Sequence, residues 1–181
     1  LAIVLQGMLR DGVTTWMPSL IADTYNMSNS VSILTGVALP VFGIICFRAA
    51  EQLYRLSPNN PVKCAGMIFA AGAISAAVLY LTSGRNAALT VFCSALLTGC
   101  MHGVNLLLIC MVPPYYKKYG GVSTISGLLN SCTYIGSAIS TYGIAAIADR
   151  FDWQTTVFAW VIIAAAGSIV CFACAGPWKK F

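Results

Sequence analysis

The run AALTVFCSALLTGCMHGVNLLLICMV, residues 87–112, contains no aspartate, glutamate, lysine or arginine. It exceeds the roughly 20 apolar residues that a helix needs to cross a bilayer. Five further apolar runs, separated by polar or turn-rich stretches, occupy residues 1–22, 31–47, 62–81, 123–148 and 155–175. The sequence therefore predicts an all-α polytopic membrane protein, with residues 1–181 forming a single domain of six transmembrane helices.

The composition favours a bilayer over a soluble fold. Hydrophobic residues make up 59% of the chain and charged residues 8%, against roughly 25% charged residues in soluble domains. The basic residues are scattered and form no stripe interleaved with aromatics, so the net charge of +5 does not indicate a nucleic-acid partner. The expected surroundings are the lipid bilayer of a plasma or inner membrane.

The eight cysteines lie in or at the start of apolar runs, and we interpret them as free thiols packed as small apolar side chains. They are Cys46, Cys64, Cys93, Cys100, Cys110, Cys132, Cys171 and Cys174. Cys171 and Cys174 have the spacing of a redox pair but lack a hydrophilic catalytic context. No soluble-enzyme motif, metal-ligand cluster or phosphate loop is found, so we expect no enzyme, no metal and no cofactor.

Basic residues predict the orientation, because they concentrate on the cytoplasmic side. One side would hold Arg48, Arg55, Lys63, Lys117, Lys118, Lys179 and Lys180, and the other only Arg85 and Arg150. Both ends of the chain are therefore expected to be cytoplasmic. The chain also starts at Leu1 inside an apolar run, so we expect it to be a fragment of a longer protein.

Prolines within the runs predict local breaks. Pro18 and Pro40 should kink a span or open its backbone. Residues 16–18 and 112–114 also place proline near the ends of the first and fourth runs. A three-plus-three inverted repeat would put these two helices in corresponding positions.

The first run contains two adjacent charges, Arg10 and Asp11, of which Arg10 lies roughly 13 Å from the helix start. A charge at this depth costs about 2.5–3.5 kcal/mol. Gln6, Arg10 and Thr14 recur every four residues and share a face that could line a watery cavity. Two interpretations of Arg10 are open. In the first, Arg10 is structural: it pairs with Asp11 or another helix, or its side chain reaches to the membrane surface. In the second, its forked donors form a site for phosphate or carboxylate.

Two other runs carry candidate ligand-binding side chains. His102 and Asn105 share a face of the fourth run, where His102 is either a hydrogen-bonded packing residue or a protonation-linked substrate contact. Gly99 and Gly103 nearby predict close helix packing. The fifth run has a polar stripe, made of Ser126, Asn130, Thr133, Tyr134, Ser137 and Thr141. This stripe fits either interhelical hydrogen bonds or a hydrated pathway, and Asn130 and Tyr134 are its best ligand candidates.

Several of these stretches resemble the organophosphate:phosphate antiporters, the glycerol-3-phosphate and hexose-phosphate transporters of the major facilitator superfamily. Residues 9–13 (LRDGV) and 16–20 (WMPSL) are similar to that family's seventh helix, which reads LRYG and then W-x-P-T-Y-L. Two further parts of the chain are similar to that family. Residues 36–40 resemble its helix eight. Its helices ten to twelve are similar to the part of the chain that contains Lys117, Lys118, Gly121, Gly127 and the stretches 134–137 and 149–153. The chain thus resembles the C-terminal six helices of a twelve-helix transporter.

The resemblance implies specific roles. Arg10 matches an arginine that grips the substrate phosphate, and Tyr134 matches a tyrosine near the cavity. Asp11 stands where the family has tyrosine, which weakens the positive potential, and the gating motif after helix eight is degraded over residues 46–51. These departures leave open a relative that carries another organic anion.

We therefore expect half of a secondary transporter that moves a small organic anion, such as an organophosphate or sugar phosphate, by alternating access in exchange for phosphate. Its partners would be the anionic substrate and an N-terminal six-helix half. Arg10, Tyr134, Asn130, His102, Asn105 and Gln6 are the predicted substrate-binding residues. One alternative is a proton-coupled symporter in which Asp11 or His102 carries the proton, and another is a membrane receptor that binds the same solute without transporting it.

Overall fold

The computed structural model describes residues 1–57 and 60–178, and its regular structure is helical throughout. The elements are α1 (Ala2–Tyr25), α2 (Asn29–Thr35), α3 (Ala38–Leu56), α4 (Pro61–Thr82), α5 (Ala87–Asn105), the π-helical stretch η1 (Leu106–Met111), the 3-10 helix η2 (Pro113–Tyr119), α6 (Val122–Arg150) and α7 (Trp153–Trp178). None of the described residues forms a strand, which confirms the all-α prediction.

Four helical segments of the described chain are long and apolar enough to cross a membrane: Ser32–Leu56, Pro61–Thr82, Ala87–Tyr119 and Trp153–Trp178. The chain is therefore a membrane protein with several transmembrane helices. Helices α1 and α6 have the length, with 24 and 29 residues. Their hydropathy is lower because α1 carries Arg10, Asp11 and Asp23, and α6 is rich in serine, threonine and glycine. Hydropathy thus supports four of the six predicted spans.

The boundaries of the first predicted span lie within a few residues of those of α1, and the last four agree equally well with α4, with α5 and η1, with α6 and with α7. The second predicted span, 31–47, is wrong in two respects. It is divided by a turn at Gly36 into α2 and α3, and α3 continues to Leu56. The predicted connection after Phe47 is helical because Glu51 pairs with both Arg48 and Arg55, at 3.5 and 2.7 Å, along one helical face.

The two internal prolines behave differently. Pro40 lies in the first turn of α3, where a missing N–H group leaves no carbonyl unsatisfied, so the break falls before it at Gly36. Pro18 lies inside α1, and Ser32 of α2 donates a hydrogen bond to its carbonyl oxygen. This contact fixes α2 against the last turns of α1. The loop predicted at 113–122 is also largely helical, since η2 occupies most of it.

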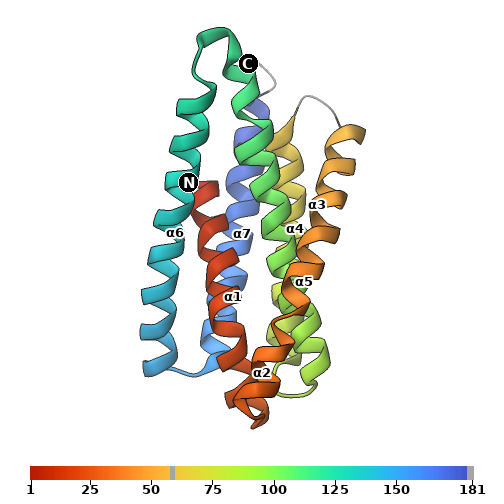
Figure 1. Ribbon diagram of the computed structural model, residues 1–181, viewed down its shortest axis with the longest axis vertical. Coiled ribbons are helices and arrows are strands. Elements are labelled where there is room, and N and C mark those ends of the chain that lie inside the picture. Colours follow the sequence, from red (N-terminus) through yellow and green to blue (C-terminus); the bar gives the residue numbers. More distant parts are fainter. Residues whose placement is uncertain (58–59, 179–181) are drawn as a thin grey trace.

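The helices form two rows (Figure 1). In the view of Figure 1, α6, α1, α5 and α3 stand side by side in front, with α7 behind α1 and α4 behind α5. The chain alternates in direction from one long helix to the next, so the C-terminal ends of α3 and α7 lie with the N-terminal end of α4. The front row contains all of the predicted site residues.

The pattern of helix contacts has an internal symmetry. The most extensive contacts are α4 with α7, α1 with α6 and α3 with α5, followed by α4 with α5, α1 with α5 and α1 with α7. Exchanging α1 with α5, α3 with α6 and α4 with α7 converts each of these contacts into itself or into another of them. The first three long helices therefore pack as the last three do.

The basic residues of the described chain gather mainly at one end of the bundle. Arg55 and Lys63 flank the α3–α4 connection, and Lys117 and Lys118 lie in η2 at the same end. Lys179 and Lys180 lie outside the described residues. The assignment of this end to the cytoplasm stays a prediction.

At the opposite end, polar contacts fix the start of α7. The Trp153 indole donates a hydrogen bond to Asp23 of α1 over 2.9 Å. Asp152 accepts hydrogen bonds from the hydroxyl and the backbone N–H of Thr155, at 2.7 and 2.9 Å. These bonds cap the helix and hold the pKa of the Asp152 carboxyl below its ordinary value.

Candidate functional site

Arg10 and Asp11 form an ion pair in the middle of α1. The Arg10 Nε–H group donates to Asp11 Oδ1 over 2.5 Å, and an Nη2–H group donates to Oδ2 over 2.8 Å. The two side chains are 17% and 31% exposed. Of the interpretations open for Arg10, pairing with Asp11 is thus the one found in this structure. The guanidinium is held by a carboxylate in the bidentate manner in which it would hold an anionic ligand.

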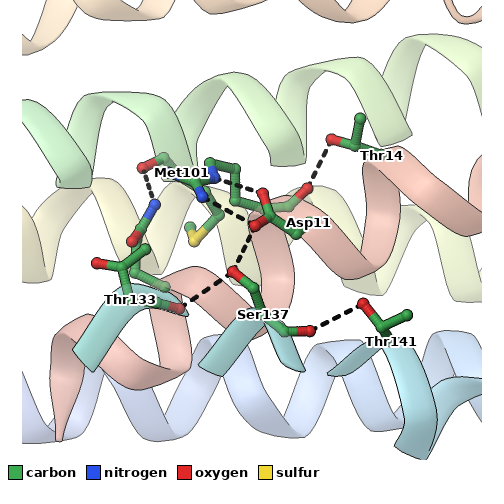
Figure 2. Close-up of polar contacts among 8 residues, drawn as sticks. Asp11, Thr14, Met101, Thr133, Ser137 and Thr141 are labelled. Atoms are coloured by element: carbon green, nitrogen blue, oxygen red, sulfur yellow. Dashed lines mark hydrogen bonds and ion pairs between the residues drawn. The ribbon is translucent and has the colours of Figure 1, made fainter. Parts of the chain in front are cut away.

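A second helix contributes to the pair. Ser137 of α6 donates a hydrogen bond to Asp11 Oδ2, and its Oγ also lies 3.0 Å from the carbonyl oxygen of Thr133 (Figure 2). A serine hydroxyl has one proton and can satisfy one of these acceptors at a time. The charged carboxylate is the stronger acceptor. Ser137 therefore ties α6 to the charged pair of α1.

Glycine makes this contact possible. A Cβ on Gly7 of α1 would overlap the carbonyl oxygen of Thr133, and a Cβ on Gly136 of α6 would overlap that of Val4. The two backbones consequently approach more closely than side chains would allow. Thr133 and Ser140, which are 1% and 2% exposed, are enclosed at this contact.

The polar stripe of α6 is therefore divided. Its Thr133 and Ser137 side takes part in the α1–α6 contact, which supports the interhelical interpretation for these two residues. Asn130 and Tyr134 lie at the edge of the stripe, and both are exposed. Tyr134, at 62% exposure, is also close enough to Arg10 to interact with it electrostatically. Asn130 and Tyr134 thus lie on the surface of the described chain.

Gln6 is fully buried between α1 and α5. Its Nε2 donates a hydrogen bond to the carbonyl oxygen of Met101 over 3.0 Å. Its Oε1 and the Oδ1 of Asn105 are both buried, and neither finds a hydrogen-bond partner within the described part of the chain. The structure thus places Gln6 in helix packing, although it lies on the same face of α1 as Arg10 and Thr14.

His102 lines a cavity of about 690 Å³ between α1, the α2–α3 turn, α3 and α5, which we call the α3 groove. Thr14 of α1 and Thr98 of α5 also line it. The His102 ring packs on Gly43, where an added Cβ would lie 3.3 Å from ring atom Cδ2. His102 lies within electrostatic range of Arg10 and Asp11. The groove and the ion pair are therefore neighbours, with Thr14 one helical turn from Arg10.

Sequence analysis missed the α3 side of this groove. Leu39, Ile44 and Phe47 line it and resemble ordinary lipid-facing side chains in the sequence. Thr98 could have been found, because it precedes His102 by four residues and so shares its helical face. The predicted packing role of Gly99 and Gly103 is confirmed, since both face α3 at Phe42, Cys46 and Ala50.

The cysteines and the other potential metal ligands are scattered through the described chain. The eight cysteines are free, as predicted. Within residues 1–57 and 60–178, no three His, Cys, Asp or Glu side chains gather in a way that could hold a metal ion.

No protein-family profile, curated protein or solved structure matches this chain. The Arg10–Asp11 pair and the adjacent α3 groove are therefore the features from which a function has to be inferred.

Proposed function

We propose that this chain is the C-terminal six-helix half of a major-facilitator secondary transporter that moves a small organic anion. The observation that carries this proposal is Arg10, held in the middle of α1, a helix long enough to span a bilayer, and mostly shielded from solvent. Ionisable side chains at this depth are expensive and mark solute or ion pathways more often than they stabilise a fold. The guanidinium would bind the phosphate or carboxylate of the substrate.

The mechanism is binding rather than bond chemistry. In the resting site Asp11 occupies two of the five Arg10 N–H donors, the Nε–H and one Nη2–H. An incoming anion that takes the same forked pair of donors therefore replaces the carboxylate. Ser137 can retain the released Asp11, and Tyr134 is near enough to interact with Arg10 from α6. The six helices would then rock against the other half of the protein and expose the bound anion to the opposite side.

The packing of the helices supports this architecture. Its contacts are unchanged in pattern when the first three long helices are exchanged with the last three. Transporters built from inverted repeats bind their substrates near the membrane midplane, where the repeats meet. Helices α1 and α5, which correspond under this exchange, contact each other and carry Arg10 and His102.

The pairing of Arg10 with Asp11 favours a second candidate, proton-coupled symport. Protonation of Asp11 would remove its charge and free the guanidinium, so proton and anion would bind together. The titratable groups within electrostatic range are Arg10 on α1 and His102 on α5. Tyr134 on α6 interacts with Arg10, and α7 carries only cysteines as titratable side chains.

The test is exchange of radiolabelled inorganic phosphate by the intact protein in proteoliposomes. Arg10→Lys should abolish exchange because lysine cannot provide forked donors. Arg85→Lys, at an exposed turn, is the matched control and should leave exchange unchanged. Normal exchange by the Arg10 variant would refute the site. An inward proton gradient should accelerate net uptake if transport is proton-coupled and have no effect on strict exchange.

A further inference from the structure

The α3 groove indicates what kind of anion the site accepts. We propose that the substrate has an apolar organic body, alkyl or aryl, which lies in the α3 groove while its anionic head binds Arg10. This inference rests on the proposed function and narrows it, because it disfavours the hydroxyl-rich body of a sugar phosphate.

One wall of the groove is apolar. Leu39, Pro40, Ile44 and Phe47 form it along α3. Gly36 and Gly43 also line the groove and add no side chain to it. A cavity of about 690 Å³ is within the range of small-molecule sites. Such a surface gains free energy by covering methylene or aromatic groups.

The polar residues that line the groove are Thr14, Arg48, Glu51, Thr98 and His102, and the first three are already engaged. Arg48 and Glu51 form an ion pair at 3.5 Å, and Glu51 also accepts a hydrogen bond from Arg55. The Thr14 hydroxyl is used, because it donates to the carbonyl oxygen of Arg10 over 2.6 Å (Figure 2). A hexose in this groove would leave several hydroxyls without partners, and each buried unpaired polar group is costly.

Thr98 gives the groove a hydroxyl that is not used in helix packing. Thr98 is 1% exposed and lines the groove, and its Oγ1 has no hydrogen-bond partner among the residues that the structure describes. Buried hydroxyls are nearly always paired. Together with His102 it could satisfy one polar atom on an otherwise apolar body.

The α3 groove is continuous with the surroundings of Arg10. Thr14 lines the groove and lies one helical turn, roughly 6 Å, from Arg10 on the same face of α1. His102 also lines the groove and lies within electrostatic range of Arg10. One ligand could therefore place its anion at Arg10 and extend past Thr14 along α3.

The experiment compares three phosphates as ligands of the intact protein in nanodiscs: inorganic phosphate, hexyl phosphate and glucose 6-phosphate. They share the head and differ in the body. Hexyl phosphate should bind at least about tenfold more tightly than the other two, since each buried methylene adds favourable transfer free energy. Equal or tighter binding of glucose 6-phosphate would overturn the inference while leaving the anion site intact. Binding of none of the three would refute the proposed function itself.

A pair of adjacent variants tests the location. Ile44→Trp places a large ring in the groove, whereas Ile45→Trp does so on the neighbouring residue, which is not part of the groove lining. Both isoleucines are more than half exposed, at 68% and 58%, so neither change should prevent folding. Ile44→Trp should weaken hexyl phosphate about tenfold and inorganic phosphate less than about twofold. Equal effects of the two variants would place the apolar body elsewhere and refute the groove.

Discussion

The helix pairs α1–α6 and α3–α5 occupy equivalent places in the contact pattern, yet the side chains beside them differ in polarity. Both rely on glycine for close approach, at Gly7 and Gly136 in the first pair and at Gly99 and Gly103 in the second. The first pair encloses polar groups and the Arg10–Asp11 ion pair. The second borders an apolar groove. One pattern of helix contacts, used twice, thus produces a charged polar contact in one place and an apolar groove in the other.

Alanine substitutions at Gly136 and Gly103 should lower the stability of the protein by different amounts, because an added Cβ would meet different neighbours. Gly136→Ala should destabilise the protein by about 3 kcal/mol, because its Cβ would overlap the Val4 backbone oxygen. Gly103→Ala should cost about 1 kcal/mol, since its nearest neighbour would be the Ala50 Cβ at 3.1 Å. Thermal unfolding in detergent, followed by loss of the monodisperse peak, measures both.

Gly143 supplies the control for these variants. It lies on α6, and nothing in the described chain would come within 4 Å of an added Cβ there. Gly143→Ala should therefore be neutral or stabilising by up to about 1 kcal/mol. Equal losses at Gly136 and Gly103 would show that the backbone contact at Gly136 is no tighter than the side-chain contact at Gly103.

Removal of the Asp11 carboxylate tests the role of the ion pair at the α1–α6 contact. Asp11→Asn should reduce stability by about 1–3 kcal/mol, less than for a fully buried pair, because Arg10 loses its counter-ion in a partly exposed site. The same change should raise phosphate affinity several-fold at neutral pH, because the guanidinium donors become available.

If transport is proton-coupled through Asp11, the affinity for phosphate should depend on pH in a definite direction. Protonation of Asp11 and binding of the anion favour each other, so wild-type phosphate affinity should rise as pH falls, and binding should take up protons. The Asp11→Asn protein should show a flat profile after correction for the charge on phosphate itself. Calorimetry in buffers of different ionisation enthalpy measures the proton uptake. A wild-type profile as flat as that of the variant would remove Asp11 from the coupling mechanism.

Ser137 should have a smaller effect. Ser137→Ala removes the hydroxyl that donates to Asp11 and should cost about 1 kcal/mol of stability. It should also make Asp11 easier to displace and so raise phosphate affinity slightly. Ser131→Ala, at an exposed position of α6, is the control and should change neither quantity. If the two variants have the same stability and the same phosphate affinity, the hydrogen bond from Ser137 to Asp11 does not affect binding.

Much of the fold could be predicted from local patterns. The apolar runs located α4, α5, α6 and α7 because a spanning helix has to be continuously apolar or else carry its polar residues on one face. The end of α3 was missed because Arg48, Glu51, Gln52 and Arg55 interrupt the apolar run after Phe47. Their helix is stabilised by pairs of Glu51 with Arg48 and Arg55, which composition alone does not show.

The candidate site could be predicted only in part. Depth in the first run identified Arg10, and helical spacing grouped it with Thr14. Whether Gln6 faces a cavity or another helix depends on the position of α5. The sequence pattern of α1 alone does not determine that position. The α3 groove depends on the relative placement of three helices. Its apolar residues look in the sequence like any others that face lipid.

The smallest predicted effect concerns Thr98, and it separates the two helix pairs most directly. Thr133 and Thr98 are both 1% exposed. The Thr133 hydroxyl donates to the Leu129 carbonyl oxygen over 3.2 Å, whereas the Thr98 hydroxyl is unpaired within the described chain. Thr98→Val should therefore leave stability unchanged or raise it by up to about 1 kcal/mol, and Thr133→Val should lower it by a similar amount. If Thr98→Val is the destabilising change, its hydroxyl is already satisfied in the protein, and the α3 groove lacks the open polar group through which it would orient a substrate.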